Sequence, residues 1–158
     1  PKFLDSQDIQ GSVRASVYLG TYHGEDLVAV TAFKSRGKDY ELVRYATSCQ
    51  VRGGHSKSVV FFERNYTYRR LITFADLTFG NGNLYRTTGW EEDSVIPPDY
   101  HYLIGGTRRH KFGFRKSSFK TNPNLQFEAG MSERELAQLN GLVRIYDAGK
   151  IKFFKTHP

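Results

Sequence analysis

Cysteine is nearly absent from this sequence, with Cys49 the single one among 158 residues. One cysteine cannot form an internal disulfide, so we expect a protein of a reducing compartment. No apolar run approaches the roughly 20 residues that a membrane helix needs, and no charged-then-apolar secretion signal opens the sequence. We therefore expect a soluble protein without a membrane partner. No spacing of His, Cys and Asp matches a metal site, so no metal is predicted.

The composition fits one folded domain. Apolar residues make up 39% of the chain and aromatic residues 15%, enough for a core at this length. We expect a single domain over 1–158, with a lead-in at 1–12, a core at 13–100 and a basic extension at 101–158. The net charge is +7. Residues 1–100 hold 12 Lys and Arg against 12 Asp and Glu, whereas the extension holds 11 against 4. This asymmetry, with interleaved aromatics, predicts contact with nucleic acid, and the alternative is a solvated basic surface.

Hydrophobic periodicity predicts a mixed order of strands and helices. The residue pattern favours strands at 13–19, 27–33, 40–46 and 71–75, helices at 56–66 and 132–139, a short helix ending at Gly89, and hairpins of 100–104 with 109–115 and of 142–146 with 151–154. Segments 34–39 and 117–130 read as loops. The aromatic and β-branched content of 56–66 leaves a strand open as the alternative there. The order predicts an α/β fold, a mixed sheet with helices on it.

A glycine-rich turn follows the strand at 40–46 and precedes a predicted helix. Gly53 and Gly54 permit unusual backbone angles and close approach to the backbone. Backbone N–H groups at a helix start bind anions, and Arg52 and Lys57 add positive charge. The turn therefore predicts an anion site, and the alternative is an ordinary tight turn.

The segment Leu84-Tyr85-x-x-x-Gly89-Trp90, about 30 residues after this turn, resembles a signature of the GNAT superfamily of N-acetyltransferases. The resemblance implies a mostly antiparallel twisted sheet flanked by helices, and acetyl-CoA or another acyl-CoA as cofactor. In the superfamily's loop pattern, Gly54 and Ser56 match the small positions, and Val51 stands where Gln or Arg is usual. The cofactor-binding residues implied are Val51, Arg52, Gly53, Gly54, His55, Ser56, Lys57 and Asn83.

Three residues are candidates for the chemistry. The resemblance implies that Tyr85 protonates the leaving thiolate, and the alternative is core packing. Asp76 ends an apolar strand, where a carboxylate either faces a site or caps the next turn. His55, in the glycine turn, is a base, a phosphate contact or a bystander. The enzyme expected is an N-acyltransferase.

A narrower resemblance, carried by segments 3–12, 41–44, 53–57, 75–85 and 144–149, is to the Mom-like domain of tailed phages. It implies transfer of a group to a base of duplex DNA, in the cytoplasm of a bacterial host. Some relatives carry this domain beside a nuclease domain, as in homing endonucleases, so a catalytically inactive DNA-binding domain is the alternative. The pattern does not indicate an oligomeric state. The nucleic-acid-binding residues predicted are Arg108, Arg109, Lys111, Arg115, Lys116 and Lys120.

Overall fold

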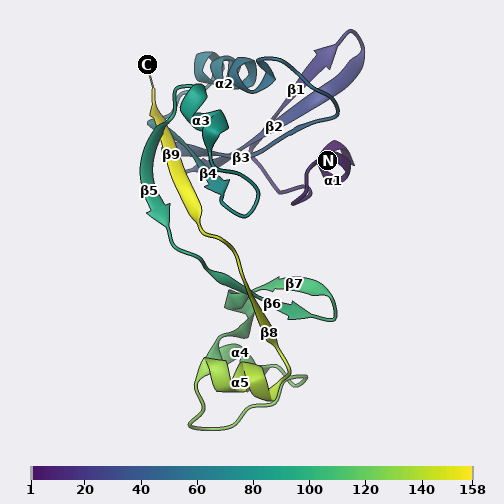
Figure 1. Cartoon of the computed structure of the whole chain (residues 1–158), viewed down its shortest axis with the longest axis vertical. Coiled ribbons are helices and arrows are strands. Elements are labelled where there is room, and N and C mark those ends of the chain that lie inside the picture. The colour runs from purple at the N-terminus through teal and green to yellow at the C-terminus, as the bar shows by residue number, and fades with distance from the viewer. Residues whose placement is uncertain (1, 158) are drawn as a thin grey trace. The chain divides into compact units, whose positions relative to one another are not determined.

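The computed structural model describes residues 2–157, and these form two compact units (Figure 1). Unit 1 comprises the described residues before Ile96 and after Lys150, and unit 2 is Ile96–Lys150. The segment predicted as a basic extension is therefore divided, because its last strand belongs to unit 1. Unit 2 has nine Lys and Arg against five Asp and Glu, a net charge of +4, and unit 1 carries the remaining +3. Within the described residues, no helix is long and apolar enough to cross a membrane.

Unit 1 contains a six-stranded sheet with the order β1-β2-β3-β4-β9-β5. Its strands are β1 (Val17–His23), β2 (Asp26–Arg36), β3 (Asp39–Thr47), β4 (Arg70–Asp76), β5 (Glu91–Ile96) and β9 (Lys150–Thr156). The first three are antiparallel neighbours, and β4 lies parallel to β3. The strands predicted at 27–33, 40–46 and 71–75 are confirmed, whereas the one predicted at 13–19 begins only at Val17 and continues to His23. The loop predicted at 34–39 is wrong, since β2 and β3 extend to a two-residue turn. Strand β5 was not predicted.

Two helices cover opposite faces of this sheet. On α2 (Gly54–Asn65), Phe62 stacks on Phe33 of β2 with ring centroids 3.9 Å apart. On α1 (Lys2–Gln7), Leu4 packs in a different cluster, beside Ala32 of the same strand. Adjacent strand residues point to opposite faces, so Phe33 and Ala32 place α2 and α1 on the two sides. The helix predicted at 56–66 is confirmed as α2, and its strand alternative is wrong. A short helix, α3 (Asn83–Thr87), follows β4.

Unit 2 is a three-stranded sheet packed on two helices. Its elements are β6 (Tyr100–Ile104), β7 (Thr107–His110), η1 (Lys111–Phe114, a 3-10 helix), α4 (Lys116–Thr121), α5 (Glu133–Leu139) and β8 (Val143–Tyr146), with the strand order β7-β6-β8. Tyr102, Phe119 and Leu136 form its core. The helix predicted at 132–139 is confirmed as α5, and a capping box begins it, since Ser132 and Glu135 bond reciprocally.

Three predictions in this region are wrong. The strand at 109–115 ends at His110, whose ring accepts the N–H of Phe112 and begins η1. The loop at 117–130 begins with α4, which buries Phe119. The hairpin of 142–146 with 151–154 does not form, because β8 pairs with β6 and β9 lies in the sheet of unit 1.

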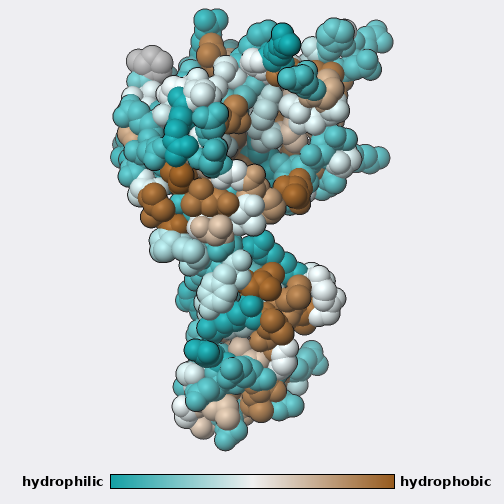
Figure 2. All heavy atoms as spheres, viewed as in Figure 1, coloured by the Kyte–Doolittle hydropathy of each residue, from teal (hydrophilic) through white to brown (hydrophobic). Residues whose placement is uncertain are grey.

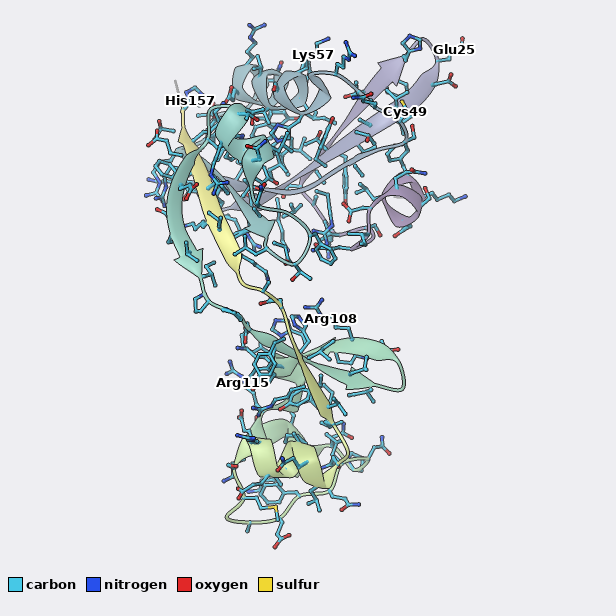
Figure 3. All side chains as sticks on the ribbon, viewed as in Figure 1. Glu25, Cys49, Lys57, Arg108, Arg115 and His157 are labelled. Carbon is cyan, nitrogen blue, oxygen red and sulfur yellow. The ribbon has the colours of Figure 1, made fainter. Side chains whose placement is uncertain are left out.

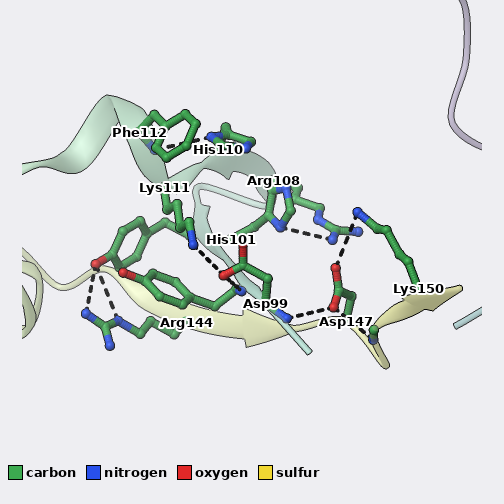
Figure 4. A network of polar contacts seen from close by, with 12 residues as sticks. Asp99, His101, Arg108, His110, Lys111, Phe112, Arg144, Asp147 and Lys150 are labelled. Carbon is green, nitrogen blue, oxygen red and sulfur yellow. Dashed lines mark hydrogen bonds and ion pairs between the residues drawn. The ribbon is translucent and has the colours of Figure 1, made fainter. Parts of the chain in front are cut away.

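Asp147 explains why that last turn does not fold back. Its buried carboxylate accepts the N–H of Asp99 at 2.8 Å and that of Gly149 at 3.0 Å, and its own N–H donates to the Asp99 carbonyl at 2.9 Å (Figure 4). The segment after β8 is thereby bound to the segment before β6, not to β8 itself. Gly149 has φ +85°, and a Cβ there would lie 2.6 Å from the Ile96 carbonyl oxygen.

Candidate active site

The candidate site lies where β3 and β4 separate. The two strands pair in parallel at two positions near their amino ends, Tyr40 with Leu71 and Glu41 with Ile72. At the next position the Thr73 hydroxyl donates to the Leu42 carbonyl oxygen at 3.0 Å, so a side chain takes the place of a backbone donor. The pairing of β2 with β3 also shifts register here, leaving Val43 as an extra residue. Such bulges bend a strand and are frequent beside active sites.

A cavity of about 510 Å³ opens beyond this point. It is lined by 42–45 of β3, 73–76 of β4, 79–85 of the following loop and α3, and 8–10 after α1. All of these residues belong to unit 1. The volume is typical of sites for small ligands.

Tyr85 is one of the residues that line this cavity. Its oxygen lies 3.3 Å from Thr73 Oγ1, and its ring packs against Phe153 with centroids 5.2 Å apart. Burial raises the pKa of the phenol, so it stays protonated at neutral pH. Tyr85 therefore packs against the core and also lines the cavity, and its role as an acid stays a prediction.

Asp76 also lines the cavity. Its Oδ1 accepts the N–H of Thr78 at 3.0 Å, so the carboxylate caps the turn after β4 as well as facing the site. A carboxylate accepts several hydrogen bonds, which leaves capacity for a ligand. Asn83 lines the same cavity at the start of α3.

His55 does not line the cavity, although it contacts two residues that do. The side chain is 3% exposed, and among the described residues neither ring nitrogen has a hydrogen-bond partner. Its ring packs edge-on against Tyr45 at 5.3 Å and Tyr85 at 5.7 Å. Burial first, and the Lys155 charge second, lower its pKa to about 4. The structure thus places a neutral imidazole behind Tyr85 and Tyr45, without bringing it into the cavity beside Asp76.

The start of α2 carries the features expected of an anion site. Gly53 precedes the helix with φ +68°, no side chain caps the helix, and its first turn has no acidic residue. A Cβ on Gly53 would meet nothing within 4 Å, so the approach to the backbone is open. Arg52 and Lys57 are exposed, and Figure 3 shows Lys57 projecting from α2. Ser56 is half-buried in the same turn.

Packing inside the protein explains why residue 54 is glycine. A Cβ there would lie 2.6 Å from the Tyr45 hydroxyl oxygen and 2.8 Å from Cγ1 of Val51. The Val51 carbonyl also accepts the Gly54 N–H at 3.2 Å. Val51 and Gly54 therefore shape the turn by packing against each other and Tyr45, and Gly53 is the glycine that leaves the backbone open.

Sequence reasoning missed Thr73, Tyr45, Phe79 and Leu84, which all line the cavity. The signal for Thr73 was a hydroxyl in an otherwise apolar strand. Phe79 and Leu84 are large apolar residues, yet they are 53% and 43% exposed. No group of three or more His, Cys, Asp or Glu within residues 2–157 is placed to hold a metal ion.

The predicted nucleic-acid-binding residues Arg109, Lys111 and Arg115 do not share a strand, because Arg109 is on β7 whereas Lys111 begins η1 and Arg115 follows it. Lys111 Nζ bonds to Asp99 Oδ1 at 2.6 Å, and the Arg115 guanidinium lies 4.4 Å from the centre of the Phe112 ring (Figure 4 shows the first of these contacts). Figure 3 shows Arg108 and Arg115 at separate places on this unit. The Arg108 side chain lies 3.1 Å from the His101 ring, and Lys116 and Lys120 are exposed on α4.

Comparison with solved structures identifies proteins of similar fold. No protein-family model and no curated protein matches the sequence. A solved acetyltransferase from Bacillus subtilis in complex with CoA is similar over 88% of this chain and 75% of that one, with TM-score 0.50 and 11% identity. A GNAT family acetyltransferase from Elizabethkingia anophelis with acetyl-CoA bound shares 16% identity over 88% and 74%, with TM-score 0.49. The first likeness confirms the predicted fold class, an α/β fold with a mostly antiparallel sheet flanked by helices.

Proposed function

We propose that this chain transfers an acyl group from an acyl-CoA to an amine. The observation that carries the proposal is the separation of β3 from β4, which opens the cavity that Tyr85 lines. The acetyltransferase fold adds support, as does the CoA held by the Bacillus subtilis protein of the same fold.

The residues present fit a CoA-type ligand. Its diphosphate is an anion, and the uncapped start of α2 offers backbone N–H groups beside two exposed cations, Arg52 and Lys57. Neither cation forms an ion pair with another described residue. Its extended amide-bearing arm suits the edge of β3 that β4 leaves unpaired, because main-chain groups there accept an added strand. Bound acyl-CoA supplies an activated thioester.

Two side chains of the cavity serve the transfer. The acceptor ammonium bonds to Asp76 and loses its proton toward that carboxylate and solvent. The free amine attacks the thioester carbon, so a C–N bond forms as the C–S bond breaks. Tyr85 would give its proton to the departing sulfur and regain the second proton that the attacking nitrogen releases, and its raised pKa keeps the hydroxyl protonated at neutral pH. Positioning of the two reactants provides the rest of the acceleration.

Calorimetric titration with acetyl-CoA tests the cofactor site. Replacing both Arg52 and Lys57 by alanine should weaken binding about ten-fold or more, since hydrogen bonds to charged groups contribute roughly 1.5–3 kcal/mol. Arg64→Ala, at the other end of α2, is the matched control and should leave the affinity unchanged. A wild-type protein that binds no acetyl-CoA at millimolar concentration would refute the proposal.

Tyr85→Phe tests the acid, because it keeps the ring and removes the hydroxyl. Loss of a general acid reduces turnover by about 10²–10⁴-fold. Release of free thiol from acetyl-CoA measures this rate, and acetyl-CoA affinity should stay the same. If turnover by Tyr85→Phe equals that of the wild type, Tyr85 is a packing residue and not the acid.

DNA contact is the second candidate function, and the Mom-like resemblance makes DNA the acceptor as well. The observation in its favour is the net charge of +4 on unit 2, with Phe112 58% exposed beneath the Arg115 guanidinium. Salt-dependent binding to duplex DNA tests it, since each neutralised phosphate adds about −0.9 to the slope of log K against log salt. Removing three arginines of unit 2 should make the slope shallower, and removing three cations of unit 1 should not. The two triple variants are Arg108, Arg109 and Arg115 to alanine, and Arg14, Lys38 and Arg64 to alanine.

A further inference from the structure

The cavity has an apolar rim drawn from three separate parts of unit 1. Ile9 after α1 is 80% exposed, Phe79 in the β4–α3 loop 53%, and Leu84 on α3 43%. Figure 2 shows groups of hydrophobic side chains exposed on the face of unit 1 that is in view. Large apolar side chains that converge on one opening from distant segments mark a surface that contacts a ligand.

The charges of the lining leave one carboxylate uncompensated. Asp8, Arg44 and Asp76 are its only ionisable residues that are charged at neutral pH. Arg44 Nε lies 3.5 Å from Asp8 Oδ1, and the guanidinium also donates to the carbonyl oxygens of Gly11 and Val43. Arg44 and Asp8 therefore offset each other's charge, and Nε and Nη1 of Arg44 donate to backbone carbonyl oxygens. The negative charge of Asp76 remains, beside the neutral amides of Gln10, Asn81 and Asn83.

We infer that the acceptor is an amine on an apolar body that carries no negative charge, with its ammonium at Asp76 and its body against Ile9, Phe79 and Leu84. This inference rests on the acyl transfer proposed above. An ammonium compensates the Asp76 carboxylate, and burying the body removes exposed apolar surface from water on both partners.

Acceptors with phosphate or carboxylate groups are disfavoured by the same lining. At 4 Å, two like unit charges repel by about 1 kcal/mol in water and about 4 kcal/mol near a protein surface. No uncompensated cation of the lining offsets this repulsion. A base amine of DNA, the acceptor that the Mom-like resemblance predicts, would bring phosphates to this opening. The cavity thus favours a small apolar amine over DNA.

The experiment compares acceptors after acetyl-CoA binding has been measured on the same protein. Thiol release is followed with phenethylamine, with phenylalanine (which adds one carboxylate), and with an adenine-rich single-stranded oligonucleotide. We expect kcat/KM for phenethylamine to exceed that for phenylalanine at least about ten-fold, and Asp76→Asn to reduce this ratio because it removes the repelling charge. Preference for phenylalanine or for the oligonucleotide overturns the inference.

Variants of the rim separate selection from folding. Phe79→Ser and Leu84→Ser should each raise KM for phenethylamine about three- to ten-fold while acetyl-CoA affinity stays the same. Phe61→Ser is the matched control, because Phe61 is 54% exposed on α2 and lies outside the cavity lining. If the rim variants behave like Phe61→Ser, the inference is wrong even though acyl transfer stands. A wild type that binds no acetyl-CoA overturns both proposals together.

Discussion

Replacing His55 by leucine tests whether the folded protein holds a neutral imidazole. Burial and the Lys155 charge lower the pKa of His55 from 6.5 to about 4. The unfolded chain therefore binds a proton more readily than the folded protein does. The stability that depends on the neutral ring is complete above pH 6.5 and is lost as the pH falls toward 4. One pKa unit corresponds to 1.36 kcal/mol, so the total effect is about 3 kcal/mol.

Urea denaturation at pH 7.5 and pH 4.5 measures the effect. Leucine cannot titrate, so the wild type should lose roughly 2.5 kcal/mol more than His55→Leu between the two values. Every other titrating group is present in both proteins and cancels in the difference. At pH 7.5 the variant should be as stable as the wild type or more so, because no hydrogen bond to the ring is removed. Equal losses of unfolding free energy in the two proteins between the two pH values would refute the reasoning. A variant with a much lower free energy of unfolding at pH 7.5 would indicate a hydrogen-bond partner for the His55 ring.

Three further substitutions test packing. Gly54→Ala should destabilise the protein by about 1–3 kcal/mol in urea denaturation, and Tyr45→Phe should partly relieve this, since the added Cβ meets the Tyr45 hydroxyl oxygen at 2.6 Å. Asp147→Ala should lower the free energy of unfolding by about 2 kcal/mol because it leaves two backbone N–H groups without their acceptor, whereas Asp147→Asn retains an oxygen and should lose less. Gly82→Ala should lower the melting temperature, since φ is +79° there and the Cβ would lie 2.7 Å from the Phe153 ring; an unchanged melting temperature would contradict this.

Strands that alternate or bury apolar residues could be predicted, and elements without that pattern could not. β2 buries Ala29 to Phe33 in succession and was recognised. Every residue of β5 is exposed, and its Glu91-Glu92-Asp93 start resembles a loop. It is a strand because it pairs with β9, which is remote in sequence. Likewise α4 buries Phe119 alone, so it shows no helical period.

In the candidate site, too, features set by nearby residues could be predicted and features set by residues distant in sequence could not. Tyr85 and Asp76 could be predicted, because a short motif and the end of a strand are local features. The cavity could not, because it depends on where β3 leaves β4, and the bond that marks this point joins Thr73 to Leu42, 31 residues apart in sequence.

His55 and Gly54 show why residue type alone misleads. A histidine in a glycine turn has the chemistry of a base, but helix α2 directs it into a cage of aromatic rings where it has no hydrogen-bond partner. A glycine beside a predicted anion site suggests room for a ligand, yet at Gly54 the room is filled by Tyr45 and Val51. The surroundings of both residues are set by packing inside the chain. Gly53, by contrast, combines a left-handed backbone with open space, so its surroundings leave room for a ligand.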